Sequence, residues 1–351
     1  MPPSERVQGQ NTKVKFPYDI NLVDKETTDK LLQDFTGERT GFVQVGPKKY
    51  FFPYKYLHDA ESIYNFPVRQ DDVFIVTFPR SGTTWTQEMV WLLCNQLDFE
   101  GAARVPLLQR VPFFEYSLFV HKNIKAELLE RNAGDDGKLR VVQDMDLPMW
   151  DELQKVKGRR YIKTHMPFSL LPPNLLTSGC KIIYVARNPK DVSVSFYHLN
   201  RLMLTQGYNK DWRTYWEYFS KNLQPWTPYW EHIKEGYEQR NNPNVMFMFY
   251  EEMTKNVPAV LNKLSSFLDV QVDPDQMEKL VDHLSIKNFR NNKSVNFDLL
   301  GQVGVCINGE EGFIRKGKVG NSSDFDEELS KKYEEWLEYN RKNVIDLTFP
   351  L

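Results

Sequence analysis

Four short apolar runs punctuate the chain from residue 73 onward, and residues typical of loops bound each of them. The runs cover Val73–Phe78, Arg160–Thr164, Lys181–Ala186 and Val245–Phe249. They show little alternation of apolar and polar positions and are rich in β-branched and aromatic residues, as strands buried on both faces are. The pattern therefore predicts four strands of a sheet that is covered on both sides.

Helical patterns follow three of these runs. The ranges 83–93 and 258–268 carry apolar residues at helical spacing. Asn188, Pro189 and Asp191 form a typical helix start, with a cap, a proline at the first position and an acid in the first turn. The alternation of strands and helices predicts an α/β fold: a single domain with a central parallel sheet flanked by helices.

The pattern also divides the chain into regions. Residues 1–40 are interpreted as a variable, partly ordered lead-in, and 41–351 as one domain, because no clear linker interrupts it. Two stretches, 98–158 and 290–325, favour neither strand nor helix. We expect them to be irregular, which in a compact domain is typical of lids and binding loops.

Composition and charge narrow the classes of partner. Aromatic residues make up 14% of the 351 residues, which suits either a large ordinary core or a pocket for a flat apolar ligand. The formal net charge is −2, whereas a general polyanion binder would show a strong basic excess. Nucleic acid is therefore not expected as a partner, while a small anion would need only a local cluster of donors.

The chain carries no sign of export or membrane insertion. Its first residues are polar, and no apolar run approaches the ~20 residues that a membrane span needs. Cys94, Cys180 and Cys306 are odd in number and far apart, a pattern typical of neither a disulfide framework nor a zinc site. These features predict a cytoplasmic protein without a membrane partner.

The first candidate site lies between a predicted strand and the helix that follows it. Helix N-termini bind phosphate well, and Gly82 would let the backbone approach a ligand closely. Arg80 adds a forked cation for oxyanions, and Trp85 offers a ring for stacking on a base. The hydroxyl donors in this run are Ser81, Thr83 and Thr84. A capped helix after a turn would use similar residues, so the run alone leaves both readings open.

The second candidate site is a histidine at the end of a predicted strand. Parallel strands end where α/β sites gather, and a neutral imidazole accepts a proton near pH 7. Lys163 precedes His165 by two residues, so both side chains point to one face of the strand. The pair suits a base with an electrostatic clamp, although a lone histidine at a strand end is more often structural.

Two further runs favour anion binding. Arg187 stands at a strand–helix junction, with Ser195 two turns later near the same helix face. A local ion pair between Arg187 and Asp191 is the simpler explanation of that run. The downstream segment 312–320 has an Arg-Lys-Gly core between glycines, which indicates a flexible cationic loop or a solvated basic turn.

Together these runs resemble the cytosolic sulfotransferases, which use 3′-phosphoadenosine-5′-phosphosulfate (PAPS) and release 3′-phosphoadenosine-5′-phosphate (PAP). The run 78–85 is similar to the family's Tyr-Pro-Lys-Ser-Gly-Thr-Thr-Trp, with Arg80 where the family has Lys. Lys-Thr-His-x-Pro is intact at 163–167, and Arg-Lys-Gly is intact at 315–317. The Asp-Trp that usually follows the latter is replaced by Asn321-Ser322.

The resemblance implies roles for individual residues. His165 would be the general base, Lys163 would stabilise the moving sulfuryl group, and Arg80 would assist the leaving group, with no metal. Leu284 and Ile286 stand where the family has Thr and Phe near the adenine. The implied nucleotide contacts are Arg80, Ser81, Gly82, Thr83, Thr84, Trp85, Arg187, Ser195, Tyr250, Leu284, Ser285, Ile286, Phe313, Ile314, Arg315, Lys316 and Gly317.

The acceptor is less defined than the nucleotide. The spacing from Trp85 to Lys163 resembles insect members of the family, including retinol dehydratase, and 98–158 is predicted to be a lid over an apolar acceptor pocket. The predicted pocket residues are Phe78, Phe113, Phe114, Phe119 and Phe168. The implied acceptor is a small apolar hydroxyl compound such as a phenol, sterol or retinoid.

Three hypotheses about activity follow. The first is transfer of the sulfuryl group of PAPS to the acceptor hydroxyl. The second is dehydration like that of retinol dehydratase, through a transient sulfate ester. The third is a non-catalytic protein that binds PAP or PAPS. The usual dimerisation motif of the family, Lys-x-x-x-Thr-Val-x-x-x-Glu, is not found, and 323–329 stands near its place, so monomer and homodimer both stay open.

Overall fold

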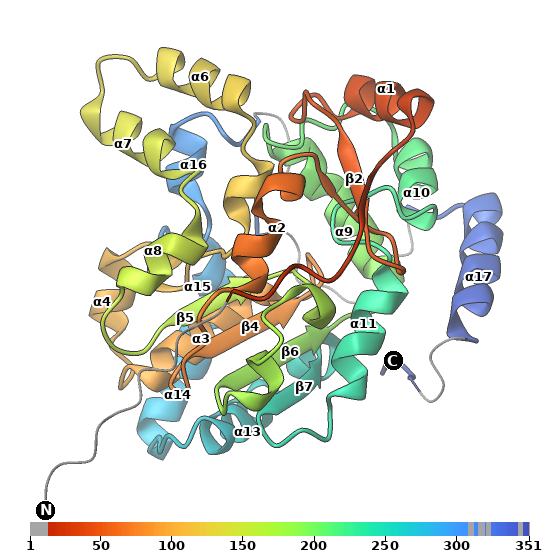
Figure 1. The fold of residues 1–351 in the computed structure, drawn as a ribbon. Coiled ribbons are helices and arrows are strands. Elements are labelled where there is room, and N and C mark those ends of the chain that lie inside the picture. The colour runs from red at the N-terminus through yellow and green to blue at the C-terminus, as the bar shows by residue number, and fades with distance from the viewer. Residues whose placement is uncertain (1–12, 308–311, 315–319, 321–323, 343–346, 351) are drawn as a thin grey trace, which may run out of the picture.

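The computed structural model describes residues 13–307, 312–314, 320, 324–342 and 347–350. The four predicted strands are present as β4 (Val73–Thr77), β5 (Tyr161–Thr164), β6 (Lys181–Ala186) and β7 (Val245–Phe249). They pair in parallel in the order β5-β4-β6-β7 (Figure 1). The predicted class, an α/β domain with a parallel sheet, is confirmed.

Each face of this sheet packs on its own apolar core. Along β4, Phe74 and Val76 join one core, whereas Val73 and Ile75 join the other. Because both faces are buried, the strands need apolar residues at every position, which explains their lack of alternation. The first face is covered by α9 (Pro189–Leu202), α10 (Trp212–Ser220) and α11 (Tyr229–Glu238). The second face is covered by α3 (Thr83–Cys94), α13 (Val257–Phe267) and α14 (Pro274–His283).

The predicted helix starts are capped by local side chains. The Asn188 side chain accepts a hydrogen bond from the Lys190 N–H at 2.9 Å, immediately before α9. Asn256 caps α13 in the same way, by accepting from the Ala259 N–H at 3.0 Å. These caps satisfy N–H groups that would otherwise lack a partner in the first turn. The predicted helices over 83–93 and 258–268 are confirmed to within one residue.

A second, antiparallel sheet lies beside the first and was not predicted. It contains β1 (Ile20–Leu22), β2 (Phe42–Val45) and β3 (Tyr50–Pro53), with α1 (Lys25–Asp34) and α2 (Tyr56–Tyr64) next to it in the chain. The described part of the predicted lead-in therefore includes a strand, which pairs with β2.

The prediction that 98–158 is irregular is wrong, because this stretch folds into short helices. They are α4 (Phe99–Arg104), α5 (Leu107–Arg110), η1 (Tyr116–Phe119), α6 (Lys122–Arg131), α7 (Asp136–Asp144) and α8 (Met149–Lys155). Asp98, His121 and Asp135 cap three of them. None exceeds ten residues, so each is too short to show a clear helical period.

The helices α6 and α7 form a hairpin with a small core of its own. Ile124 and Leu128 of α6 and Val142 of α7 pack with Leu300 of α16 (Asp298–Gln302). Figure 1 shows these three helices together at the upper left. The Asn132 amide group donates to the Val303 carbonyl at 3.0 Å.

The remaining elements are η2 (Phe168–Leu170), η3 (Leu175–Thr177), α12 (Tyr250–Lys255), α15 (Ile286–Asn291) and α17 (Glu327–Arg341). Within 290–325, the described residues are thus partly helical as well.

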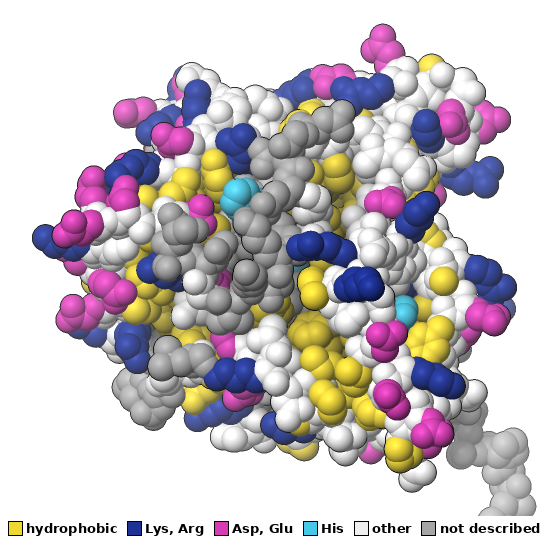
Figure 2. Space-filling model, turned by 180° about the vertical axis from the view of Figure 1, so that it is seen from behind, with side chains coloured by type: hydrophobic (Ala, Val, Ile, Leu, Met, Phe, Trp, Pro, Cys, Tyr) yellow, Lys and Arg dark blue, Asp and Glu magenta, His cyan; other side chains and the backbone are white. Residues whose placement is uncertain are grey.

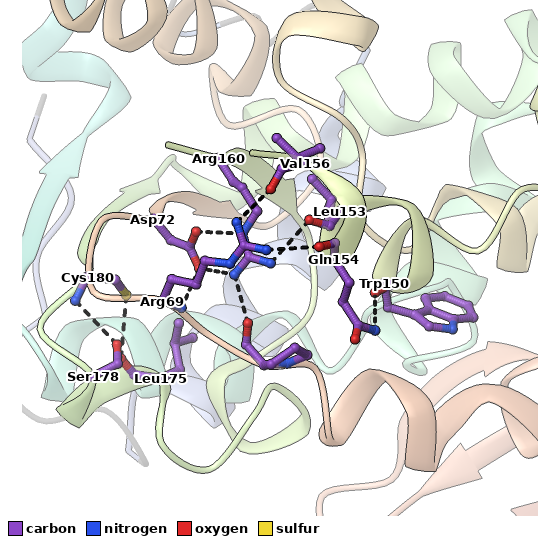
Figure 3. A network of polar contacts seen from close by, with 11 residues as sticks. Arg69, Asp72, Trp150, Leu153, Gln154, Val156, Arg160, Leu175, Ser178 and Cys180 are labelled. Carbon is purple, nitrogen blue, oxygen red and sulfur yellow. Dashed lines mark hydrogen bonds and ion pairs between the residues drawn. The ribbon is translucent and has the colours of Figure 1, made fainter. Parts of the chain in front are cut away.

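A buried ion pair joins the two segments that lead into β4 and β5 (Figure 3). The Arg160 guanidinium donates to both carboxylate oxygens of Asp72, at 2.7 and 2.5 Å, and both side chains are fully buried. Arg160 also donates to the carbonyls of Leu153 and Pro67, and Asp72 accepts the Arg69 N–H. The pair is therefore well partnered, as buried charges must be.

The surface carries charges of both signs. Figure 2 shows basic and acidic side chains interspersed over the face seen from behind, with apolar side chains between them. None of the helices in the described ranges combines the length and the apolar character that crossing a bilayer would require.

Candidate active site

The carboxyl ends of the parallel strands open into a cavity of about 260 Å³. This is the edge at which parallel α/β sheets collect their ligands. Sixteen of the sequence-predicted site residues line it: Arg80, Gly82, Thr83, Thr84, Trp85, Phe113, Phe119, Lys163, His165, Arg187, Ser195, Tyr250, Leu284, Ile286, Phe313 and Ile314. The structure thus brings residues from distant parts of the chain to one place.

The loop before α3 has the form of an anion site. Gly82 precedes the helix with a φ of 91°, and a Cβ there would stand 2.6 Å from the Tyr250 ring, so both conformation and space require glycine. The buried Ser81 hydroxyl has no hydrogen-bond partner within the described part of the chain. Since the first N–H groups of a helix also lack partners, this end of α3 suits a phosphate.

Two predicted anion-binding arginines meet beside that loop. The Arg80 Nε donates to the Ser195 hydroxyl at 2.9 Å, and Arg187 donates to the Arg80 carbonyl at 2.9 Å. The Arg187 guanidinium also lies over the Tyr250 ring, 4.4 Å from its centroid. Arg80 itself has a φ of 70°, which is rare for a residue with a side chain. These contacts concentrate positive charge at one end of the cavity.

The adenine-side predictions are also placed by the structure. The Trp85 indole donates to the Leu284 carbonyl at 3.1 Å, and its ring meets Tyr250 edge-on at 6.3 Å. Ser285 does not line the cavity, because its side chain caps α15 by accepting from the Asn288 N–H. Ser81 is buried behind the lining. Arg315, Lys316 and Gly317 lie outside the described residues.

His165 is held in one tautomer. Its Nδ1 lies 2.8 Å from the Thr77 carbonyl oxygen, which can only accept, so Nδ1 carries the hydrogen and Nε2 has the lone pair. Burial, followed by the charge of Lys163, lowers the pKa of His165 well below its usual 6.5. The imidazole is therefore neutral at pH 7 and competent to accept a proton at Nε2.

Lys163 lines the same cavity as His165. Its ammonium lies over the Phe113 ring, 3.9 Å from the centroid. Burial lowers the pKa of Lys163 to about 7, although the charge of Glu115 acts in the opposite direction. The segment before η1 runs beside β5, because the Phe114 N–H donates to the Lys163 carbonyl at 2.8 Å. This pairing fixes Phe113 against Lys163.

Three of the five predicted pocket phenylalanines, Phe78, Phe114 and Phe168, do not line the cavity. Phe78 packs edge-on against Tyr229, with ring centroids 5.0 Å apart. Phe114 points away from Phe113, as successive residues of extended chain do, and meets other core rings. Phe168 packs on Tyr184. These three rings thus lie in the core, because the sequence does not reveal which rings of the chain face a cavity.

The apolar end of the cavity combines the predicted Phe119 with residues that the sequence analysis did not assign, among them Trp226. Phe119 lies against the Trp226 indole with centroids 4.3 Å apart, and Trp226 lies edge-on to His165 at 5.2 Å. Further apolar side chains that line the cavity are those of Leu108, Tyr116, Phe196, Leu199, Met203, Phe297 and Leu300. A row of rings, Trp226 and then Phe119, therefore extends from His165 along the apolar part of the cavity.

A buried glutamate behind the cavity was also missed. Glu115 accepts hydrogen bonds from the His165 N–H at 2.7 Å, the Thr164 hydroxyl at 2.8 Å and the Trp226 indole at 3.1 Å. On the other side, the His232 Nε2 donates to the His165 carbonyl at 2.8 Å. One signal was available, since Glu115 is a lone acid within the apolar run 111–120.

Comparison with known proteins supports a single family. Residues 70–346 match the family model described as a sulfotransferase domain. Luciferin sulfotransferase of Photinus pyralis is 33% identical over 318 residues, which cover 88% of this chain and 82% of that protein. Sulfotransferase 1E1 of Bos taurus is 32% identical over 291 residues, which cover 82% and 89% respectively.

A solved structure resembles the whole fold. The structure of retinol dehydratase in a complex with retinol and PAP is 36% identical, with a TM-score of 0.89 over 96% of this chain and all of that one. The family model spans most of the sequence, and the strand-end histidine and the glycine loop lie where its matched region folds into one cavity. The chain therefore belongs to the sulfotransferase family.

Proposed function

We propose that the protein transfers the sulfuryl group of PAPS to the hydroxyl of a small apolar acceptor. The observation that carries this proposal is the tautomer of His165, which leaves a lone pair on Nε2. His165 lines the cavity together with Lys163. The cavity is cationic at one end and apolar at the other. Such a site suits an anionic donor and an apolar acceptor that meet at the imidazole.

The nucleotide would occupy the cationic end. The N-terminal N–H groups of α3 and the unpartnered Ser81 hydroxyl suit the 5′ side, and Arg187 with Ser195 suits the 3′-phosphate. PAP is the molecule bound in the retinol dehydratase complexes, which supports the same choice here. Gly82 lets backbone and ligand approach where a side chain would clash with Tyr250.

The transfer would proceed in line. As the acceptor oxygen bonds to sulfur, its proton moves to the His165 Nε2, and the bond between sulfur and the phosphate oxygen breaks. Lys163 and Arg80 are positioned to neutralise negative charge that develops on the sulfuryl and phosphate oxygens. Fixed cations in a buried site need little reorganisation during this step.

Binding of PAP to the purified protein is the primary test. We expect calorimetry to detect one PAP site per chain, and labelled PAPS with a panel of phenols, sterols and retinoids to give labelled sulfate esters. Adenosine without phosphates serves as the control ligand and should bind far more weakly. No measurable affinity for PAP would contradict the proposal.

The acceptor would lie along the row of rings from His165 to Phe119. Retinol and androsterone are the small molecules named beside PAP in the retinol dehydratase complexes, and the apolar lining here supports a similarly elongated alcohol. Helices from 98–158 and α16 contribute Leu108, Phe119 and Leu300 to the wall. We therefore keep 98–158 as the proposed cover of the acceptor.

Truncation of Phe119 tests this acceptor site. Phe119→Ala removes the ring that packs on Trp226, so the KM for an apolar alcohol should rise about tenfold, as loss of a buried aromatic contact implies. Steady-state kinetics and PAP titration of the same variant separate the two ligands. An equal loss of affinity for PAP and acceptor would indicate a general folding defect instead.

Dehydration through a transient sulfate ester is the second candidate. The 36% identity to retinol dehydratase over nearly the whole chain favours it. The proton transfer at His165 is common to both outcomes, and the acceptor decides whether the ester then eliminates sulfate. Mass spectrometry of the product from retinol distinguishes a retained ester from an alkene. The non-catalytic alternative is disfavoured by the His165 and Lys163 arrangement.

The last two proposals concern the cellular location and the oligomeric state of the protein. The family resemblance and the free thiols of Cys94, Cys180 and Cys306 support a cytoplasmic enzyme. Monomer and homodimer are both compatible with the chain, and sedimentation of the purified protein decides between them.

A further inference from the structure

A buried carboxylate lies directly behind the proposed transfer site. The two oxygens of Glu115 have different partners: Oε1 accepts from the His165 N–H and the Trp226 indole, and Oε2 accepts from the Thr164 hydroxyl. The side chain is fully buried and does not line the cavity, so it does not touch a substrate there. Its contacts instead hold the strand end that carries the base and the indole that faces it.

The same carboxylate acts on the charge of the cavity. The charge of Glu115 raises the pKa of Lys163, whereas the charge of Arg80 lowers it. The charges of Lys163, His232 and Arg80 all lower the pKa of His165. Burial raises the pKa of Glu115 to about 7. Among these groups Glu115 supplies negative charge when it is ionised, and the others supply positive charge when protonated.

We propose that Glu115 is a positioning residue of the transfer reaction, which orients His165 and Trp226 through its hydrogen bonds. Its charge, which favours the ammonium form of Lys163, supports the same role. This inference rests on the proposed function. It adds a requirement that the motif residues alone do not contain, because the strand carrying Lys163 and His165 has to be paired with a distant acid.

The variant Glu115→Gln separates the two effects of the side chain. An amide retains an oxygen for the His165 N–H and the indole, and its NH₂ group meets the Thr164 hydroxyl with the direction of that hydrogen bond reversed, so the shape and the contacts are kept while the charge is lost. Removal of the Glu115 charge, which favours the ammonium, lowers the pKa of Lys163, by about one unit as the loss of an opposite charge typically does. Lys163 should then lose its proton at a lower pH.

The pH profile of kcat/KM gives the expected result. In Glu115→Gln the alkaline limb should move about one pH unit lower, with activity about tenfold below the parent at pH 8 and within about threefold at pH 6. Glu115→Leu also removes the acceptors, so its activity should fall at every pH. A Glu115→Gln profile that matches the parent, or that falls equally at all pH values, would overturn the charge effect.

Two controls complete the experiment. Glu88 is also fully buried, but it pairs with Arg110 at 2.8 Å, so Glu88→Gln should leave the alkaline limb where it is. The pH dependence of Lys163 acylation, followed by peptide mass spectrometry without nucleotide, should shift in the same direction in Glu115→Gln. This measurement does not depend on turnover, so a failure of the proposed function and a failure of this inference give different results.

Discussion

Replacing His165 with alanine is expected to lower the rate of sulfuryl transfer by about 10²–10⁴-fold, the usual contribution of a general base. The effect should be confined to the chemical step. His165 Nε2 is the nitrogen left without a hydrogen by the Nδ1 bond to Thr77, so the variant loses the proton acceptor. The proposed phosphate-binding residues Arg187, between β6 and α9, and Ser195, in α9, are unchanged. PAP affinity should therefore stay within about twofold of the parent.

Single-turnover kinetics with labelled PAPS and calorimetry with PAP measure the two quantities separately. His58→Ala, at an exposed position on α2, is the matched control and should retain full activity. If His165→Ala turns over at nearly the parent rate, the imidazole is not the base. If PAP binding is lost together with turnover, the residue has a structural role in the nucleotide site.

The acid side of the parent pH profile follows from the same residue. The pKa of His165 lies well below 6.5 because burial and Lys163 disfavour the imidazolium. Nε2 therefore stays unprotonated as the pH falls from 8 to 6.5, and activity should decline only at lower pH. An acid limb of kcat/KM centred above pH 6.5 would contradict this environment.

Replacing Asp72 with alanine is expected to lower the free energy of unfolding by about 3–5 kcal/mol, the largest stability effect we predict. The variant leaves the Arg160 guanidinium fully buried and removes both of its hydrogen bonds to Asp72 (Figure 3). A buried charge without its counter-charge cannot regain the hydration that it lost on folding. The segments entering β4 and β5 should separate first.

Urea unfolding of the purified protein measures this effect. The double variant Asp72→Leu with Arg160→Met removes both charges and should cost less than either single change, because no unpaired charge remains. Asp29→Ala breaks the exposed ion pair between Lys25 and Asp29, and it should change stability by less than about 0.5 kcal/mol. A loss below 1 kcal/mol in Asp72→Ala would mean that water or other groups compensate Arg160.

Parts of the fold follow from local pattern. The strands β4 to β7 and the helices after three of them are encoded by burial and capping signals that lie within each element. The short helices between 98 and 158 could not be predicted in this way, because their caps and apolar faces are spread over too few residues. The antiparallel sheet β1-β2-β3 could not be predicted either, since its first strand has only three residues.

The candidate chemistry could be read from local sequence: glycine, hydroxyls and arginine before one helix, and lysine with histidine at one strand end. These are local arrangements, so neighbouring residues suffice to reveal them. Contacts in the folded chain were needed to establish which nitrogen of His165 carries the hydrogen and that Phe113 rather than Phe114 faces Lys163. The tertiary structure also decided that Glu115 lies behind both groups. Each of those outcomes depends on contacts between segments distant in the chain, where burial and pairing are set by packing.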